Sequence, residues 1–400
     1  MLTELVSLFL LSCAVLLWLP VTLLFVQVLA ATRPLAARPL AQGQRPVVAV
    51  LVPAHNEAQG IAAALNSVSS QLTGADRLLV VADNCADDTA RVATLAGAEV
   101  VERTDKVHVG KGYALDYGIR HLERTPQRGT PAVLVMVDAD CIATPGAINQ
   151  IAQLSASSGR PVQATYLMQA VQPASVLASI AEFAWLVKNK VRPLGAHRLG
   201  LPCHLMGSGM AFPWPAICAM PLASGHIVED MKLGLDFARA GTPPLFCPGA
   251  LVLSRFPTGA SVASGQRTRW EHGHLGLIVK EAPGLLLDGL RGRGASLLAL
   301  AFDLCVPPLA LLVFMAFALF AAAALFALVT GVVFPALVAG LSVLALVVAV
   351  GLCWWYFGRE LLAFSALLLA PIYVLRKLPL YLKFLVRRQA TWVRAKRDGD

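Results

Sequence analysis

The sequence predicts an α/β domain with a mostly parallel, buried sheet, joined to about three transmembrane helices. Hydrophobic residues make up 57% of the 400 residues and charged residues only 14%, which is too apolar for an ordinary soluble protein. Two long stretches, Leu5–Thr32 and Leu304–Gly358, contain no charged residue. Between them, short apolar runs alternate with longer amphipathic stretches. The first two observations predict the membrane helices, and the third predicts the sheet.

The uncharged stretches are long enough to cross a bilayer, since a spanning helix needs about 20 apolar residues. The first stretch fits one helix, and the second fits two with a turn near Gly331 and Pro335. A cleaved signal peptide is the alternative for the first stretch. It is disfavoured because Glu4 precedes the run without any Lys or Arg, and because the run is about twice the usual length.

Basic residues gather after the uncharged stretches. The formal net charge is +9, and residues 376–400 hold eight Lys or Arg against two Asp, which leaves +6 in the tail. A basic tail can bind nucleic acid, but after a hydrophobic block the positive-inside rule explains it better. Arg33, Arg38 and Arg45 follow the first helix in the same way. We therefore predict a multi-pass protein of the inner (plasma) membrane with an external N-terminus, a cytosolic middle region and a cytosolic C-terminus.

These patterns divide the chain into five segments. Residues 276–303 resemble amphipathic helices at the membrane surface, and Leu361–Leu375 is short for a span and is typical of an interfacial helix. The expected segments are a transmembrane helix (1–32), a cytosolic α/β domain (45–275), interfacial helices (276–303), two transmembrane helices (304–358), and an interfacial helix with a basic tail (359–400).

The α/β domain is predicted from apolar runs that carry no polar alternation. Strands of this kind are buried on both faces, which indicates a parallel sheet covered by helices. The predicted strands are Val47–Val52, Arg77–Ala82, Ala98–Val101 and Ala132–Val137, and the predicted helices between them are Glu57–Gln71, Asp87–Ala96 and Tyr113–Glu123. Polar motifs follow the first, second and fourth strands, where ligands bind in such sheets.

Asp138-Ala139-Asp140 is the motif that most clearly indicates chemistry. Residues two apart in a strand face the same side, so both carboxylates can address one ligand at the strand end. Mg²⁺ and Mn²⁺ prefer oxygen ligands and are often shared between carboxylates and substrate phosphates. A solvated turn is the alternative, although charges are costly beside so apolar a strand.

Three weaker motifs lie elsewhere. Glu229-Asp230 offers a carboxylate for general-base catalysis or a helix N-cap, and spacing alone does not separate the two. Gln266-x-x-Arg269-Trp270 combines an amide, a cation and an indole, and suits either a sugar diphosphate or an interfacial tryptophan anchor. Lys111 opens a helix after a glycine, where it could reach a phosphate or remain a solvated lysine.

Together the motifs resemble family 2 glycosyltransferases with the GT-A fold, in the branch of cellulose, chitin and poly-N-acetylglucosamine synthases. The resemblance covers about residues 45–290. It rests on six motifs in the family's order: Pro53-Ala54-His55-Asn56-Glu57, Asp83-Asn84-x-x-Asp87-x-Thr89, Lys111-Gly112-x-Ala114, Asp138-x-Asp140, Glu229-Asp230 and Gln266-x-x-Arg269-Trp270.

The resemblance implies an inverting, metal-dependent hexosyltransferase that uses a UDP-sugar donor and a saccharide or lipid-linked acceptor. Asp140 and Asp138 would hold Mg²⁺ or Mn²⁺, and Asp230 would be the catalytic base. Gly207–Gly209 would border the acceptor pocket. The remaining implied ligands of the nucleotide, diphosphate and acceptor sugar are Pro53, Glu57, Asp83, Lys111, Asp138, Gln266, Arg269 and Trp270.

Two alternatives to a processive synthase remain open. Three spans are few for a self-contained polymer channel, so a transferase that adds one sugar to a lipid-linked acceptor fits comparably well. A transporter or channel subunit with a non-catalytic nucleotide-binding domain is disfavoured. Its spans would be expected to contain a charged residue, and the sequence has no Walker-type phosphate loop.

Overall fold

The computed structural model describes residues 1–34, 44–126, 130–257 and 259–386, with the side chains of 260–263 excepted. Most of the predicted linker and the basic tail beyond Val386 lie outside the described residues. The chain divides into two compact units. Unit 1 contains Met1–Pro34, Gln172–Gly200 and His274–Arg388, and unit 2 contains Leu35–Val171, Leu201–Gly273 and Gln389–Asp400.

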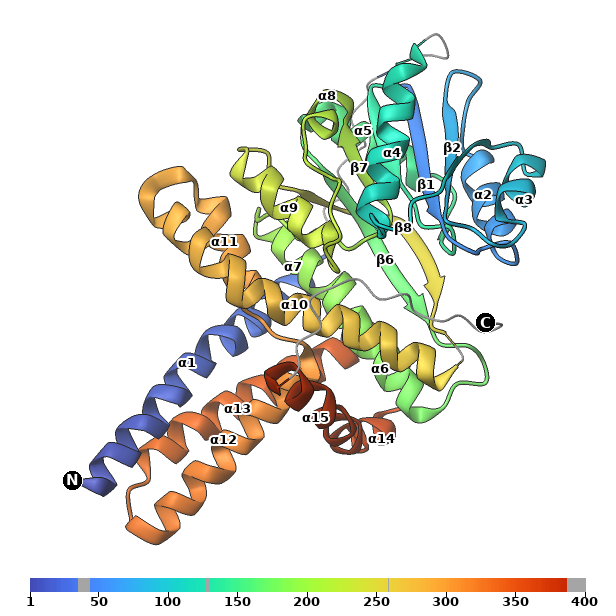
Figure 1. Ribbon diagram of the computed structural model, residues 1–400. Coiled ribbons are helices and arrows are strands. Elements are labelled where there is room, and N and C mark those ends of the chain that lie inside the picture. Colours follow the sequence, from blue (N-terminus) through green and yellow to red (C-terminus); the bar gives the residue numbers. More distant parts are fainter. Residues whose placement is uncertain (35–43, 127–129, 258, 387–400) are drawn as a thin grey trace. The chain divides into compact units, whose positions relative to one another are not determined.

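Unit 2 is built on one eight-stranded sheet with the strand order β3-β2-β1-β4-β7-β6-β8-β5 (Figure 1). The first four positions form a parallel half, in which β1 pairs with β2 and β4, and β2 pairs with β3. The strands are β1 Val48–Ala54, β2 Arg77–Asp83, β3 Glu99–Arg103, β4 Val133–Met136, β5 Ile142–Ala143, β6 Val162–Gln169, β7 Met210–Pro213 and β8 Leu245–Arg255.

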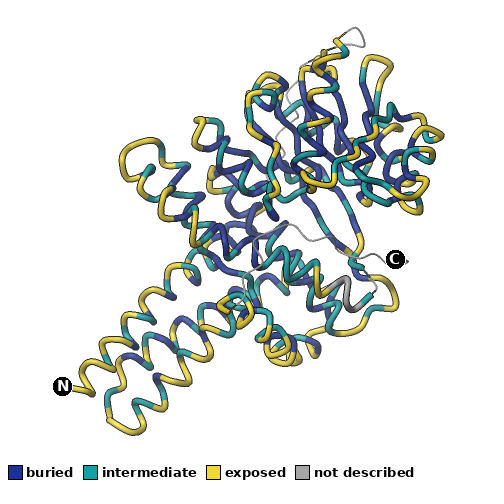
Figure 2. The backbone as a smooth tube through the Cα atoms, viewed as in Figure 1, coloured by how far each residue is buried: buried dark blue, intermediate teal, exposed yellow. Residues whose placement is uncertain are grey.

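The parallel half is the part that the apolar runs predicted. β1, β2 and β4 are buried along nearly their whole length, because helices cover both faces of this half (Figure 2). The helices of unit 2 are α2 Ile61–Ser69, α3 Thr89–Leu95, α4 Lys111–Arg124, α5 Ala147–Ser158, α8 Trp214–Cys218, α9 Glu229–Arg239 and the first part of α10 Ala260–Asp288. The predicted α/β fold with a mostly parallel sheet is therefore confirmed.

The second half of the sheet mixes directions. β7 runs antiparallel to both β4 and β6, whereas β6 and β8 are parallel to each other. Each residue of β7 lies opposite a residue of β4, the strand that leads to Asp138. The chain that precedes β7 contains Gly207–Gly209, and this pairing brings that loop to the end of β4.

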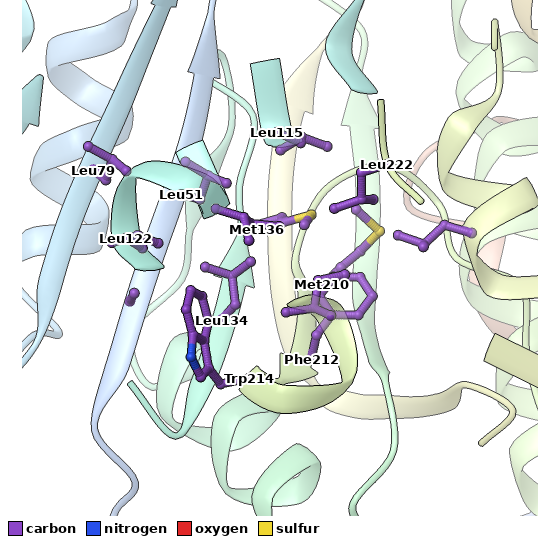
Figure 3. Close-up of a cluster of buried hydrophobic side chains, with 14 of the residues drawn as sticks. Leu51, Leu79, Leu115, Leu122, Leu134, Met136, Met210, Phe212, Trp214 and Leu222 are labelled. Carbon is purple, nitrogen blue, oxygen red and sulfur yellow. The ribbon is translucent and has the colours of Figure 1, made fainter. Parts of the chain in front are cut away.

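A large hydrophobic core fixes one face of the sheet (Figure 3). Leu51, Leu79, Leu134 and Met136 point to this face from three neighbouring strands and pack against apolar residues of α4, α8 and α9. The packing leaves no room for a side chain at Gly118 of α4, since a Cβ there would lie 2.5 Å from Leu51 Cδ1. Because α4 and α9 share this core with β4, their N-terminal residues are held in a fixed relation to the end of that strand.

Unit 1 is helical and apolar. Its elements are α1 Leu2–Ala31, α6 Val176–Leu186, the π-helix η2 Val187–Val191, α7 Arg192–Arg198, the remainder of α10, η3 Gly289–Arg293, α11 Ala295–Leu304, α12 Leu309–Thr330, α13 Phe334–Cys353, η4 Trp354–Gly358, α14 Phe364–Leu367 and α15 Ala370–Val386. α1, α12 and α13 pack against one another (Figure 1).

A polar cluster joins three elements of unit 1 that are distant in sequence. Arg192 donates to Asp303 Oδ1 at 2.7 Å and to Gln27 Oε1 at 3.1 Å, and Gln27 Nε2 donates to the same carboxylate at 2.6 Å. Arg198 also donates to the carbonyls of Ala30 and Ala31 at the end of α1. These contacts hold Gln172–Gly200 to the N-terminal helix, an association that the sequence pattern does not indicate.

Four segments in the described part of the chain are long and apolar enough to cross a membrane. Three of them, Leu2–Ala31, Leu309–Thr330 and Phe334–Gly358, are the spans that the sequence predicts, with mean hydropathies of 2.5 to 2.7. The fourth, Phe364–Val386, has a mean hydropathy of only 1.3 and overlaps Leu361–Leu375, the segment predicted to be interfacial.

Candidate active site

Polar side chains follow three neighbouring parallel strands at one edge of the sheet. β1 ends at Ala54 and leads directly to His55, β2 ends at Asp83, and β4 ends two residues before Asp138. Because these strands are parallel, their carboxyl ends meet at the edge where ligands bind in open α/β sheets.

Asp83 is held by a cation from the neighbouring strand. It lies opposite Arg103 in the register of β2 and β3, and Arg103 Nη1 donates to Asp83 Oδ1 at 2.7 Å. The second terminal nitrogen of Arg103, Nη2, donates to Asp105 Oδ2 at 3.0 Å and to the His108 carbonyl at 2.8 Å. Burial raises the pKa of the Asp83 carboxyl, and the Arg103 charge opposes that rise. Arg103 therefore orients the buried Asp83 carboxyl and favours its ionised form.

The first motif lies beside Asp83. Pro53 is the last residue but one of β1, and the buried Glu57 donates its backbone N–H to Thr89 Oγ1 at 2.7 Å. The His55 Nδ1 lies 2.6 Å from the Asp83 carbonyl, which can only accept, so this nitrogen carries a hydrogen. The residues that the family resemblance assigns to the nucleotide thus lie close together in the chain's fold, with Pro53 and Asp83 at adjoining strand ends and Glu57 in the loop after β1.

Asp138 and Asp140 lie side by side in the turn after β4. With Cys141 they form a group whose potential ligand atoms all lie within 4.8 Å of one another, and no histidine belongs to this group in the described part of the chain. The sequence argument from strand alternation was wrong in its detail, because the strand ends at Met136. A turn, closed by a hydrogen bond from the Cys141 N–H to the Asp138 carbonyl at 3.0 Å, brings the carboxylates together.

The chemistry of this turn fits a hard divalent cation. The protein around the Asp140 carboxyl limits its hydration, although part of the side chain stays exposed, and this effect together with the Asp138 charge raises its pKa to about 6. A cation beside two such carboxylates relieves their repulsion. Burial raises the pKa of the Cys141 thiol well above its usual value, so the thiol stays protonated and is a poor ligand for Mg²⁺ or Mn²⁺.

Lys111 connects three parts of the site. It is the first residue of α4, and its Nζ lies 2.5 Å from Asp138 Oδ1, 3.9 Å from Glu229 Oε1 and 2.7 Å from the Gly207 carbonyl, to which it donates. Burial alone would lower the pKa of Lys111, but Asp138 and the acids at the start of α9 raise it above its usual value. The structure places Lys111 against the carboxylates of the turn and of α9.

The loop Gly207–Gly209 lies against Asp230. Gly207 has a φ of +96°, and a Cβ added there would lie 3.2 Å from Asp230 Oδ2. Ser208 Oγ accepts the Asp138 N–H at 3.1 Å. Gln163, fully buried in β6, accepts the Met206 N–H at 2.7 Å and donates to the Ser208 carbonyl at 2.8 Å. This loop is therefore hydrogen-bonded to the Asp138 turn and lies against Asp230 of α9.

Glu229 and Asp230 are the first two residues of α9, and Val228 is its N-cap. Asp230 is therefore not the cap, which removes the alternative that spacing had left open. Burial raises the pKa of the Glu229 carboxyl, Lys111 opposes this rise, and the nearby Asp230 charge adds to it. Two acids and one lysine thus share a small volume at the start of this helix.

Gln266, Arg269 and Trp270 lie on one face of α10, since they are three and four residues apart. Arg269 is close enough to Glu229 for its charge to lower the pKa of that carboxyl. One turn further on, a Cβ at Gly273 would lie 2.5 Å from Val228 Cγ1, so the absence of a side chain lets α10 approach the start of α9. The last motif is thus brought to the acids of α9.

Sequence patterns missed two residues that shape the site. Arg103 is the last residue of β3 as Asp83 is the last of β2, and a cation at that strand end was a usable signal. Gln163 is a polar residue near the start of the mostly apolar strand β6, which was a second signal. Ser208 lies inside the predicted loop Gly207–Gly209, but the sequence did not indicate its hydrogen bond with the Asp138 N–H.

The fold and the site define a nucleotide-binding type of α/β transferase. The sequence model of the glycosyltransferase-like family 2 matches residues 45–273, more than half of the chain, and the chain therefore belongs to this family. A search of curated proteins gives no match.

Two solved structures illustrate the likeness. The mannosyltransferase PcManGT from Pyrobaculum calidifontis, in complex with GDP-Man and Mn²⁺, is 16% identical with a TM-score of 0.59, over 95% of this chain and all of that one. A glucosyl-3-phosphoglycerate synthase from Mycobacterium tuberculosis, in complex with Mn²⁺, UDP-glucose and phosphoglyceric acid, is 22% identical with a TM-score of 0.37, over 57% of this chain and 79% of that one. The first likeness shows that the fold extends over nearly the whole chain.

Proposed function

We propose that this protein is a membrane-bound inverting hexosyltransferase of exopolysaccharide or glycolipid synthesis. It takes a sugar from a nucleotide diphosphate donor, a UDP-sugar, and transfers it to a polysaccharide or lipid-linked saccharide. The observation that carries the proposal is the Asp138 turn, with Lys111 bridging it to the acids of α9 at the carboxyl edge of the parallel strands.

Asp138 and Asp140 would hold Mg²⁺ or Mn²⁺, which their oxygen ligands and mutual repulsion suit. The bound metal would neutralise charge on the departing diphosphate. Both solved relatives were determined with Mn²⁺, which supports the choice of metal. Lys111 keeps Asp138 in position from the other side.

The nucleotide would lie along the ends of β1 and β2. Pro53 from the end of β1 and Glu57 from the loop after it would contact the base and ribose, and Asp83, oriented by Arg103, would accept a base N–H. Uracil and guanine both present such a ring N–H. One relative was solved with UDP-glucose and the other with GDP-Man, so both nucleotides belong in the test.

Asp230 would act as the general base. The acceptor hydroxyl oxygen attacks the anomeric carbon from the face opposite the diphosphate, the bond from that carbon to the phosphate oxygen breaks, and the nucleotide diphosphate leaves. The hydroxyl proton passes to the Asp230 carboxylate. Its position against Gly207, the residue that borders the expected acceptor pocket, supports this role.

Gln266, Arg269 and Trp270 would hold the diphosphate and the acceptor sugar. Arg269 supplies a cation that is already close to Glu229, and a guanidinium can pair with a diphosphate through two parallel hydrogen bonds. The indole of Trp270 offers a face on which a sugar ring can stack. This motif is the one that favours the cellulose, chitin and poly-N-acetylglucosamine synthase branch.

The membrane placement is part of the proposal. α1, α12 and α13 would span the bilayer, with unit 2 and the C-terminus in the cytosol. The fourth apolar segment would not span, because Arg376 and Lys377 lie near its middle. Placing two cations at the bilayer centre costs about 5–7 kcal/mol on the insertion scale. We assign α14 and α15 to the cytosolic interface.

The test is donor hydrolysis by the purified protein. It would be incubated with a panel of UDP- and GDP-sugars in Mg²⁺ or Mn²⁺, and the released nucleotide would be measured with and without saccharide acceptors. We expect one sugar nucleotide to be consumed, faster with its acceptor. Metal-independent binding without turnover of any donor would instead favour a transporter or channel subunit with a nucleotide-binding domain.

A further inference from the structure

Helices α14 and α15 carry an exposed apolar stripe. Its members recur at helical spacing and therefore lie on one side of the segment. Their exposed fractions run from 48% to 89%, for Leu368, Ile372, Leu375, Leu382 and Val386. No described part of the chain covers this stripe, and soluble surfaces rarely leave so continuous an apolar face in water.

Two cations border the stripe. Arg376 and Lys383 are exposed and seven residues apart, so they lie one above the other along the edge of the stripe. Lys377 differs from them, since its Nζ lies 4.9 Å from the centre of the Tyr373 ring, on the partly buried side. The helix is thus amphipathic, with apolar residues outward and positive charge along one margin.

Within unit 1, α15 packs against α12 and α6 (Figure 1). α12 is one of the helices with the composition of a membrane span. A helix in contact with a span, apolar outward and bordered by cations, matches the interface between acyl chains and headgroups. A protein partner would satisfy the apolar stripe but gives no reason for a row of cations at its edge.

We propose that α14 and α15 bind the anionic phospholipids of the cytosolic leaflet. The stripe enters the acyl region beneath the headgroups, and Arg376 and Lys383 lie at the depth of the lipid phosphates. In the sequence, Arg387 and Arg388 continue the basic run beyond the described residues. This inference rests on the membrane placement proposed for α12 and is independent of whether the protein transfers sugars.

The test is hydrogen exchange of the full-length protein in bilayer nanodiscs. One set contains phosphatidylcholine alone, and the other contains about 30 mol% phosphatidylglycerol, which gives a strongly anionic surface. Amide exchange in 370–386 would be followed by mass spectrometry. The charge variant is Arg376→Gln with Lys383→Gln. The matched control is Arg91→Gln with Arg239→Gln, which removes the same charge from exposed positions of unit 2.

We expect phosphatidylglycerol to slow exchange in 370–386. The charge variant should lose up to about 25-fold of this protection, about fivefold for each cation, whereas the control should keep it. Salt at about 0.5 M should remove most of it as well, because exposed charges are then screened within a few ångströms.

Three results would overturn the proposal. The first is equal exchange in both lipids, and the second is a slowing that survives in the charge variant. The third is strong protection in both lipids that salt does not change, which is the behaviour of a transmembrane helix. None of these readouts depends on glycosyl transfer, so an inactive protein would leave the result interpretable.

Discussion

The ammonium group of Lys111 lies 2.5 Å from the Asp138 carboxylate while it donates a hydrogen bond to the Gly207 carbonyl. One side chain therefore fixes the Asp138 turn relative to the loop that faces Asp230. Because Asp138 and Glu229 share this cation, its removal takes a counter-charge from two poorly hydrated carboxylates, and Arg269 remains near Glu229.

Lys111→Met should lower both stability and turnover. Breaking a fully buried ion pair costs about 3–5 kcal/mol, and the partial exposure of both partners reduces our expectation to about 2 kcal/mol. For a folding unit the size of unit 2, that is a fall in Tm of roughly 4–8 °C. Thermal unfolding in detergent measures it. Lys232→Met is the matched control, since it breaks a similarly exposed pair between Lys232 and Asp236, which lie one turn apart on α9. Equal shifts in the two variants would rule out a special role for Lys111.

Asp140→Ala should lower both metal binding and glycosyl transfer. With one of the two carboxylates gone, turnover should fall by well over a hundredfold, and calorimetry should detect weaker Mn²⁺ binding. Asp116→Ala, which removes an acid from the surface of α4, should change neither quantity. Full activity of the unmodified protein in excess EDTA would refute a metal-dependent reaction.

Asp230→Asn separates catalysis from structure. The amide keeps the shape of the side chain and removes its basicity, so transfer should fall by about 10²–10⁴-fold while donor affinity changes little. Asp236→Asn on the same helix is the control and should remain active. If a folded Asp230→Asn protein transfers sugar at nearly the normal rate, Glu229 becomes the next candidate for the base.

Arg103→Met should weaken donor binding and shift its pH dependence. Loss of the hydrogen bond from a charged group should raise the dissociation constant for UDP about tenfold. The Asp83 pKa, already raised by burial, should rise further without the cation. Because the ionised carboxylate accepts the base N–H, binding is lost as the pH falls through this pKa, and the loss should begin at a higher pH in the variant.

Titration calorimetry from weakly acidic to neutral pH would measure this effect. Lys106→Met removes an exposed cation from the loop after β3 and should leave the pH profile unchanged. A profile in Arg103→Met that is merely weaker, with no displacement along the pH axis, would mean that the arginine contacts the ligand directly and does not act through Asp83.

Reporter fusions should place the two ends of the chain on opposite sides of the membrane. Three spans with basic cytosolic flanks predict that a reporter after Asp400 is cytosolic and one before Met1 is external. If Phe364–Val386 crossed the bilayer as a fourth span, both reporters would lie on the same side. That outcome would also remove the interfacial assignment of α15.

Much of the parallel half could be predicted from local composition. Continuous apolar runs such as Val48–Ala54 require burial on both faces, and parallel strands between amphipathic helices are the arrangement that provides it. The strand ends then indicated Asp83 and the Asp138 turn without any tertiary information. The carboxylate pair was found for a partly wrong reason, because a turn and not strand alternation brings Asp138 and Asp140 together.

The remaining features depend on contacts between residues far apart in sequence. The hydrogen bonds of Gln163 to Met206 and Ser208 span more than 40 residues, and the Arg103 contact with Asp83 depends on strand register. The membership of Gln172–Gly200 in unit 1 depends on Arg192 reaching Asp303 across 111 positions. Composition and periodicity carry no information about such pairings.

Because Gln172–Gly200 belongs to unit 1, the α/β domain cannot be separated from the helices by cutting the chain only at its two ends. A chain cut to residues 45–273 would retain every motif and the entire sheet, yet it would also carry α6 and α7 without the helices against which they pack. Ile180, Phe183 and Leu194 would then meet water, and Arg192 would lose both of its partners. A soluble catalytic fragment therefore needs residues 172–200 replaced by a short polar connection, and removal of the terminal helices alone should yield an aggregating product.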